Sequence, residues 1–267
     1  MRTPFLICAA AVLAWPATLL GAASADRAAA AERAAEAAGI AATLKADAFD
    51  ERKHGYQALR FSGITDKAVF GAIHDRLMAL YKTPGSGHDK AAVAELIQIV
   101  DGLATSGNEA YRHDIETVAN SPRVDDKARS HAQKALDLLQ SYAKWNPIID
   151  RTRPGMAWPR ARMENLLSAD EVELQKEGLR RVKELGPADP SVYDSVEREL
   201  DKLLSEPDLG QADVENSAAY MCKYLAMTGN PKYDATLDVA AGSGHKRLEK
   251  HCGADARKRY KNSKNDD

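Results

Sequence analysis

The chain has 267 residues, with 37 Lys and Arg against 39 Asp and Glu, so its formal net charge at pH 7 is −2. So mild a balance predicts no general affinity for nucleic acid, which requires a strongly basic surface. Aromatic residues make up only 6% of the chain. The abundance of Ala, Leu, Glu, Lys and Arg favours helix over strand. The length is sufficient for a full core in one elongated domain or two small ones.

The N-terminus has the pattern of a secretory signal. Residues 5–20 are almost all apolar, and Ala23-Ser24-Ala25 fits the small-x-small cleavage pattern. We therefore expect a signal peptide over residues 1–25, cleavage between Ala25 and Asp26, and a periplasmic or secreted mature protein. The alternative is an uncleaved membrane anchor, which the short apolar stretch and the cleavage pattern disfavour. No later segment is apolar enough to span a bilayer, so we expect no transmembrane segment in the mature chain.

The second half of the chain repeats the first at an offset of about 123 residues. Leu44-Lys45-Ala46-Asp47 returns as Leu167-Ser168-Ala169-Asp170. Leu103-Ala104-x-x-Gly107-Asn108-x-x-Tyr111 returns, one residue earlier, as Leu225-Ala226-x-x-Gly229-Asn230-x-x-Tyr233. A duplication of this length is typical of repeat architectures, which usually serve as binding surfaces.

Helical spacing of apolar residues recurs in both halves. In the repeated turn, the glycine ends one helix and the asparagine caps the next. The first half predicts six helices, near residues 29–46, 48–61, 67–82, 90–105, 109–119 and 125–143. Six helices in one copy are three hairpins of about 41 residues each, which is the unit length of HEAT and armadillo repeats.

With its Leu-Ala-x-x-Gly-Asn-x-x-Tyr turn between apolar helices, the chain resembles HEAT-like repeat proteins of a secreted bacterial type over residues 40–262. The resemblance implies an all-α fold, a right-handed α-α superhelix (an α-solenoid) made of two duplicated blocks of about six helices. The expected order is a signal peptide (1–25), an Ala-rich leader (26–40), block 1 (41–144), a Trp/Pro-containing connector (145–163), block 2 (164–262) and a polar tail (263–267). The leader offers little bulk for packing, so we expect a frayed helix or a flexible lead-in.

Two features make up the candidate interaction surface. Trp145 and Trp158 lie in the connector, where three prolines interrupt the helical pattern. We interpret the connector as a crossover that packs down, and the alternative is an exposed aromatic patch for a partner or a carbohydrate. The second feature is a basic C-terminus that includes Arg257 and Arg259. It is either the polar outer face of a terminal helix or a weak contact with an anionic partner or membrane surface.

Two cysteines remain after the expected cleavage, Cys222 and Cys252. The repeat aligns them with Val100 and Ala132, so both are expected to face the core from neighbouring helices. In an exported protein this favours a disulfide, which closes a loop of about 30 residues and contributes ~3–4 kcal/mol in the chain-entropy model. The alternative is a pair of separate buried thiols.

The sequence predicts no catalytic, cofactor or metal site. No two histidines have the i, i+4 spacing of a helical metal site, and no Gly-x-Ser-x-Gly elbow occurs. The turn Pro84-Gly85-Ser86-Gly87-His88 lacks the Lys-Ser/Thr of a phosphate-binding loop. We expect a non-enzymatic binding or scaffold protein of the bacterial cell envelope, with a protein or peptide partner of unknown identity. The alternatives are an enzyme or cofactor-binding protein with a site between the blocks, as in HEAT-like lyases, and a self-associating structural component of the envelope.

Overall fold

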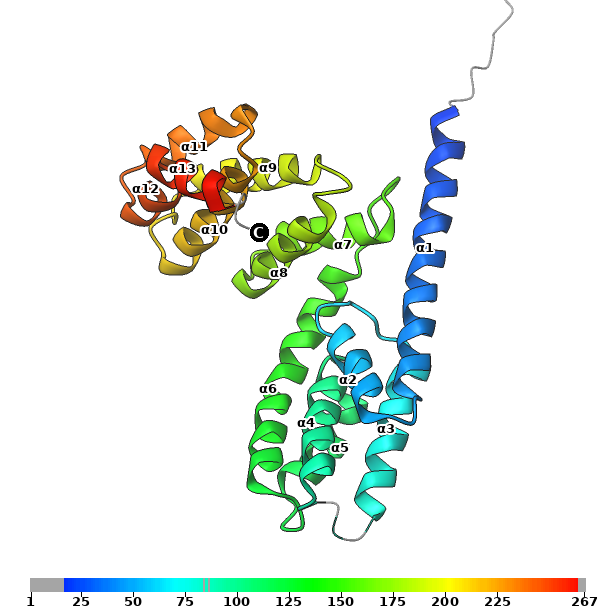
Figure 1. The fold of residues 1–267 in the computed structure, drawn as a ribbon. Helices are drawn as coiled ribbons and strands as arrows, with labels where there is room; N and C mark the ends of the chain where they lie inside the picture. The colour runs from blue at the N-terminus through cyan, green and yellow to red at the C-terminus, as the bar shows by residue number, and fades with distance from the viewer. Residues whose placement is uncertain (1–16, 84, 86, 264–267) are drawn as a thin grey trace, which may run out of the picture.

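The computed structural model describes residues 17–83, 85 and 87–263, and the regular secondary structure of this part of the chain is entirely helical, with no strand (Figure 1). The all-α prediction is therefore confirmed. The elements, in chain order, are α1 (Ala17–Leu44), α2 (Phe49–Ala58), α3 (Lys67–Lys82), α4 (Lys90–Ala104), η1 (Glu109–Tyr111), α5 (Arg112–Ala119), α6 (Asp126–Ile149), α7 (Trp158–Leu167), α8 (Val172–Leu185), α9 (Val192–Leu204), α10 (Ala212–Thr228), η2 (Pro231–Tyr233), α11 (Asp234–Ala241), α12 (Lys246–Cys252) and α13 (Ala254–Ser263).

The helices pack around separate hydrophobic clusters. One cluster draws its buried side chains from residues 40–139 and is formed by α1–α6 with the loops between them. Another draws on residues 163–252 and is formed by α7–α12. A small cluster of Ile149, Leu166, Ala169 and Leu174 lies where α6 meets α7 and α8. In Figure 1, α6 leads from the first group of helices to the second, and α1 runs along one side of the first group and beyond it.

The repeated turn folds as its sequence predicts. Gly107 and Gly229 both have positive φ angles, of 60° and 63°, which glycine adopts without strain. Asn108 accepts a hydrogen bond from the Ala110 N–H, and Asn230 accepts one from the Lys232 N–H. Each asparagine thereby satisfies a backbone donor that has no partner within the following 3₁₀ helix.

The expectation of a frayed leader is corrected by the contacts of α1. The Glu32 carboxylate accepts a hydrogen bond from the Trp158 N–H (2.8 Å), and the Glu36 carboxylate accepts one from Trp158 Nε1 (2.7 Å). Glu36 also pairs with the buried Arg162 guanidinium at 2.7 Å. Composition alone missed these contacts because they depend on two acidic side chains of α1, Glu32 and Glu36, meeting the start of α7.

The connector is shorter than the prolines suggested. Pro147 lies inside the last turn of α6 and Pro159 in the first turn of α7, so only residues 150–157 are non-helical. Proline is tolerated at the start of a helix because the missing N–H has no helical partner there, and within the last turn of α6 it removes a single backbone hydrogen bond. The connector does pack down: Trp158 is 5% exposed, and the half-buried Trp145 ring lies 5.8 Å from the Phe61 ring.

Candidate functional site: a basic groove

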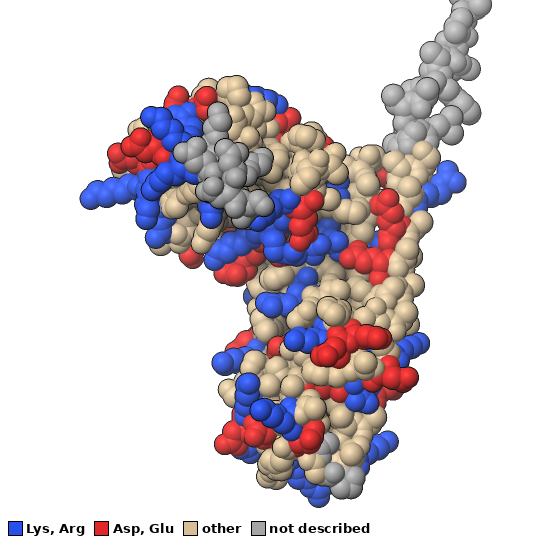
Figure 2. Space-filling model, viewed as in Figure 1, with Lys and Arg blue, Asp and Glu red and all other residues tan. Residues whose placement is uncertain are grey.

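A groove between α10 and α12 gathers basic side chains from separate parts of the sequence. It has a volume of about 430 Å³. Figure 2 shows Lys and Arg side chains over the group of helices that contains it. The lining residues are Asn216, Ala219, Tyr220 and Lys223 from α10 and Lys246, Arg247, Lys250 and His251 from α12.

A pair of buried cysteines lies directly behind the groove. Cys222 of α10 and Cys252 of α12 are both fully buried, and their sulfur atoms lie 2.02 Å apart. The structure thus places the predicted pair at disulfide distance. Cys222 precedes Lys223, and Cys252 follows His251, so this bond fixes the spacing between the two walls of the groove.

Helix α13 folds back against α10 and holds His251 in place. Nδ1 of His251 lies 2.8 Å from the Tyr260 hydroxyl, and the two rings stack with an interplanar angle of 7°. Nζ of Lys223 lies 5.9 Å from the centre of the same Tyr260 ring, which is a favourable cation–π distance. The tyrosine therefore positions a histidine from one wall and a lysine from the other.

Among the described residues, ion pairs do not neutralise the positive charge of the groove. Within the part of the chain that the structure describes, no carboxylate forms a salt bridge with Lys223, Lys246, Arg247 or Lys250. Glu215 lies near Arg247 but accepts a hydrogen bond from its backbone N–H at 3.3 Å. Burial lowers the pKa of His251, and the positive charges of Lys250, Lys223, Arg247 and Arg259 lower it further.

The structure separates the four residues of the predicted interaction surface. Arg257 is paired with Asp234 at 2.9 Å and with Asp238, so its charge is neutralised. Arg259 is exposed and donates a hydrogen bond to the Lys250 carbonyl at 3.3 Å, which places it beside the groove. Trp158 is buried and is therefore removed from an exposed surface, while Trp145 is half-buried.

Sequence reasoning missed Lys223 and Tyr220, because α10 is not itself rich in basic residues. One signal could have found Lys223. It adjoins Cys222, and the predicted Cys222–Cys252 bond already places it near the cations of α12. Tyr220 is 45% exposed, and no sequence pattern distinguishes it from the buried aromatic residues.

The expected cleavage site lies within α1. Ala25 and Asp26 are both helical, and the Asp26 carboxylate accepts a hydrogen bond from the Gly155 N–H at 3.1 Å. Residues 1–16, which hold most of the apolar stretch, lie outside the described part of the chain. Among the helices that are described, none combines the length and the apolar character needed to cross a bilayer.

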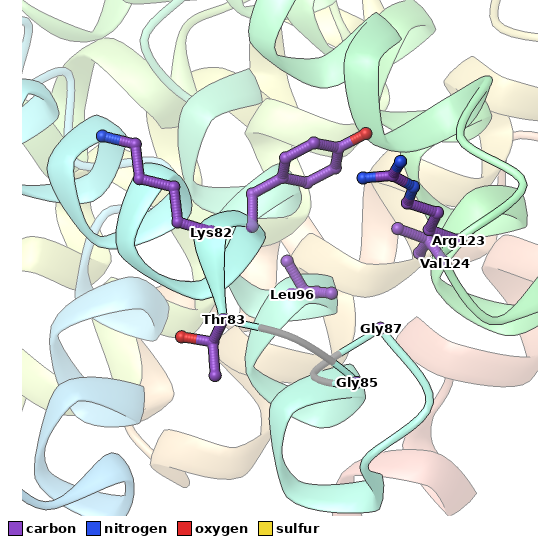
Figure 3. Close-up of a pocket in the computed structure, with 8 residues that line it drawn as sticks. Lys82, Thr83, Gly85, Gly87, Leu96, Arg123 and Val124 are labelled. Atoms are coloured by element: carbon purple, nitrogen blue, oxygen red, sulfur yellow. The ribbon is translucent and has the colours of Figure 1, made fainter.

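A smaller hollow of about 200 Å³ lies at the end of α3 (Figure 3). Figure 3 shows Lys82 and Arg123 on opposite sides of it, with Lys82 pointing away from Arg123. The Tyr81 hydroxyl already donates to the Ser121 hydroxyl at 3.0 Å. A Cβ at Gly87 would lie 1.9 Å from the Arg123 carbonyl oxygen, so this glycine serves close packing. The described residues of this hollow thus present no converging set of polar groups.

The described residues contain no cluster of three or more His, Cys, Asp or Glu side chains that could hold a metal ion. Comparisons with protein-family models, curated proteins and solved structures found no match to this chain.

Proposed function

We propose that this chain is a non-enzymatic binding or scaffold protein of the bacterial cell envelope, exported after cleavage between Ala25 and Asp26. The observation that carries the proposal is the basic groove, where Lys and Arg side chains that form no ion pair with any described residue line the wall beside the exposed Tyr220. Tyrosine and arginine are enriched at the energetic centres of protein interfaces. A wide, open groove with these side chains suits a macromolecular partner.

We also propose that the helices form two duplicated HEAT-like blocks. The matching lengths of corresponding elements support this proposal. A 3₁₀ helix followed by a short α-helix covers residues 109–119 as η1 and α5, and the same two elements, with the same lengths, cover residues 231–241 as η2 and α11. Equivalent glycines make equivalent contacts: a Cβ at Gly55 would lie 3.4 Å from the Leu44 nitrogen, and a Cβ at Gly178 would lie 2.7 Å from the Leu167 nitrogen. The first helix pair of each half, α1 with α2 and α7 with α8, is thus in close contact at a glycine.

A side-chain hydrogen bond is also repeated. Arg52 donates to the Ala46 carbonyl at 2.7 Å, and Gln175, 123 residues later, donates to the Ala169 carbonyl at 2.7 Å. Residues 46 and 169 are themselves a matched pair in the sequence repeat. Such agreement between side-chain contacts favours descent from one ancestral unit, which is the basis of repeat architectures.

The proposed function is tested by photocrosslinking in the native cell. A photoreactive amino acid replaces Tyr220 in the groove, and a matched variant carries it at Val239, which is 63% exposed on α11. We expect a discrete protein adduct from position 220 and none of the same mass from position 239. Failure to obtain a specific protein adduct from either position under several growth conditions would contradict a scaffold role. An adduct made only of two copies of this chain would instead favour the self-associating envelope component.

A further inference from the structure

We infer that the groove binds an acidic protein segment, whose Asp and Glu side chains pair with Lys223, Lys246 and Lys250. This inference rests on the proposed function and names the chemistry of its partner. Three observations on the groove carry it: the same helix pair in the first half lacks these cations, no ion pair among the described residues neutralises them, and the spacing of Lys246 and Lys250 fits an extended chain.

The first half shows that packing does not require the cations. The sequence repeat aligns Lys223 with Asp101, and it aligns Lys246 and Lys250 with Asp126 and Ser130. Helices α4 and α6 pack closely with these acidic and neutral residues in place. The basic residues of the second half are therefore not a structural requirement of the helix pair.

Like charges in one groove destabilise the folded chain by mutual repulsion. Lys246 and Lys250 are exposed and Lys223 is half-buried, and no ion pair within the described chain relieves them. A bound segment with negative side chains removes this repulsion and adds charge-assisted hydrogen bonds. Charge complementarity thus identifies an anionic occupant.

The spacing of the cations points to a polypeptide. Lys246 and Lys250 are four residues apart on α12, which is about 6 Å along a helix. Alternate side chains of an extended chain are spaced about 6.5–7 Å apart, so acidic residues at i and i+2 match the two lysines. Tyr220 adds an exposed aromatic surface to the groove, and the half-buried Asn216 offers an amide to the backbone of the bound segment. A flat bilayer would meet the rim of such a groove but not its interior.

The inference is tested with a short synthetic peptide that has Glu at alternate positions. Binding to the mature chain, beginning at Asp26, is measured by calorimetry at low and high salt, with a Gln-for-Glu peptide as the ligand control. The test variant is K223Q/K246Q/K250Q. The matched control, K127Q/K134Q/K144Q, removes the same charge from three exposed lysines of α6.

We expect the Glu peptide to bind the wild-type chain and the α6 control equally, and to weaken as salt rises. Binding to the groove variant should be about tenfold weaker, equivalent to 1.4 kcal/mol. Equal affinity for the two triple variants, equal binding of the Gln peptide, or no binding to the wild-type chain would overturn the inference. So would binding of phosphatidylglycerol vesicles without peptide binding, or a salt-sensitive dimer that the groove variant abolishes.

The two proposals fail separately. If the groove variant captures the same crosslinked protein as the wild type, the acidic-segment inference is wrong while the scaffold function stands. If photocrosslinking recovers no partner at all, the scaffold function is contradicted even where the model peptide binds.

Discussion

The bond between Cys222 and Cys252 provides the sharpest stability test, because the first half supplies a matched replacement. Val100 and Ala132 stand at the aligned positions, and both are fully buried. The variant C222V/C252A therefore removes the covalent link while introducing the side chains that are buried at the aligned positions of α4 and α6.

The expected loss follows from the length of the closed loop. The two cysteines are 30 residues apart. In the chain-entropy model a loop of about this size stabilises the folded state by about 3–4 kcal/mol. For a chain of this length each kcal/mol corresponds to about 2–4 °C, so the melting temperature should fall by about 6–16 °C.

The assay is urea and thermal unfolding of the mature chain, oxidised and reduced, beside the variant. Reduced wild type and C222V/C252A should unfold at similar, lower midpoints than the oxidised protein. The variant should also bind the Glu peptide less tightly, because the walls of the groove are no longer tied. Two free thiols in the non-reduced mass, with unfolding midpoints that a reductant does not change, would refute the reasoning.

Three further predictions concern other parts of the structure. E36Q should lower the free energy of unfolding in urea by about 1–3 kcal/mol, because it leaves the buried Arg162 guanidinium without its carboxylate. The control variant E51Q, at an exposed site, should change stability little. Equal losses in the two variants would contradict the anchoring of α1 by Glu36. G178A should destabilise by about 1–3 kcal/mol through the clash with backbone atoms of α7, whereas G71A, with nothing within 4 Å of its Cβ, should be neutral or stabilise by up to about 1 kcal/mol. The pKa of His251, measured by NMR, should lie below 6.5 in the folded protein. The unfolded chain then binds a proton at His251 more readily than the folded chain does, so this histidine favours unfolding as the pH falls below about 6.5. Bound Glu peptide should raise the pKa of His251. A His251 pKa above 6.5 in the free protein would contradict the positive field of the groove.

Local rules account for most of the fold that the sequence predicts. Residues 67–82 form the expected helix because Asp66 caps it and Val69, Ile73 and Leu77 repeat at helical spacing on a buried face. The repeated Gly-Asn turn was predictable for the same reason, since both of its residues act on their immediate neighbours.

Contacts between distant segments were not predictable from local pattern. The Ala-rich leader offered little bulk for packing, and nothing in its sequence indicated that Glu32 and Glu36 would contact Trp158 and Arg162. In the same way, the sequence predicts a charged face at the basic C-terminus. That these residues share a groove with Lys223 depends on how α10 packs against α12. Alignment with Asp101 and Asp126 contained a hint, because a charge reversed between matched positions indicates a difference in use.

The most direct measurement is the sequence of the peptide that photocrosslinks to position 220 in the native cell. We expect a segment of an exported protein with Asp or Glu at alternate positions. Crosslinking should be lost in the K223Q/K246Q/K250Q background and retained in the K127Q/K134Q/K144Q background. A crosslinked lipid, or a neutral or basic segment captured equally in both backgrounds, would contradict it.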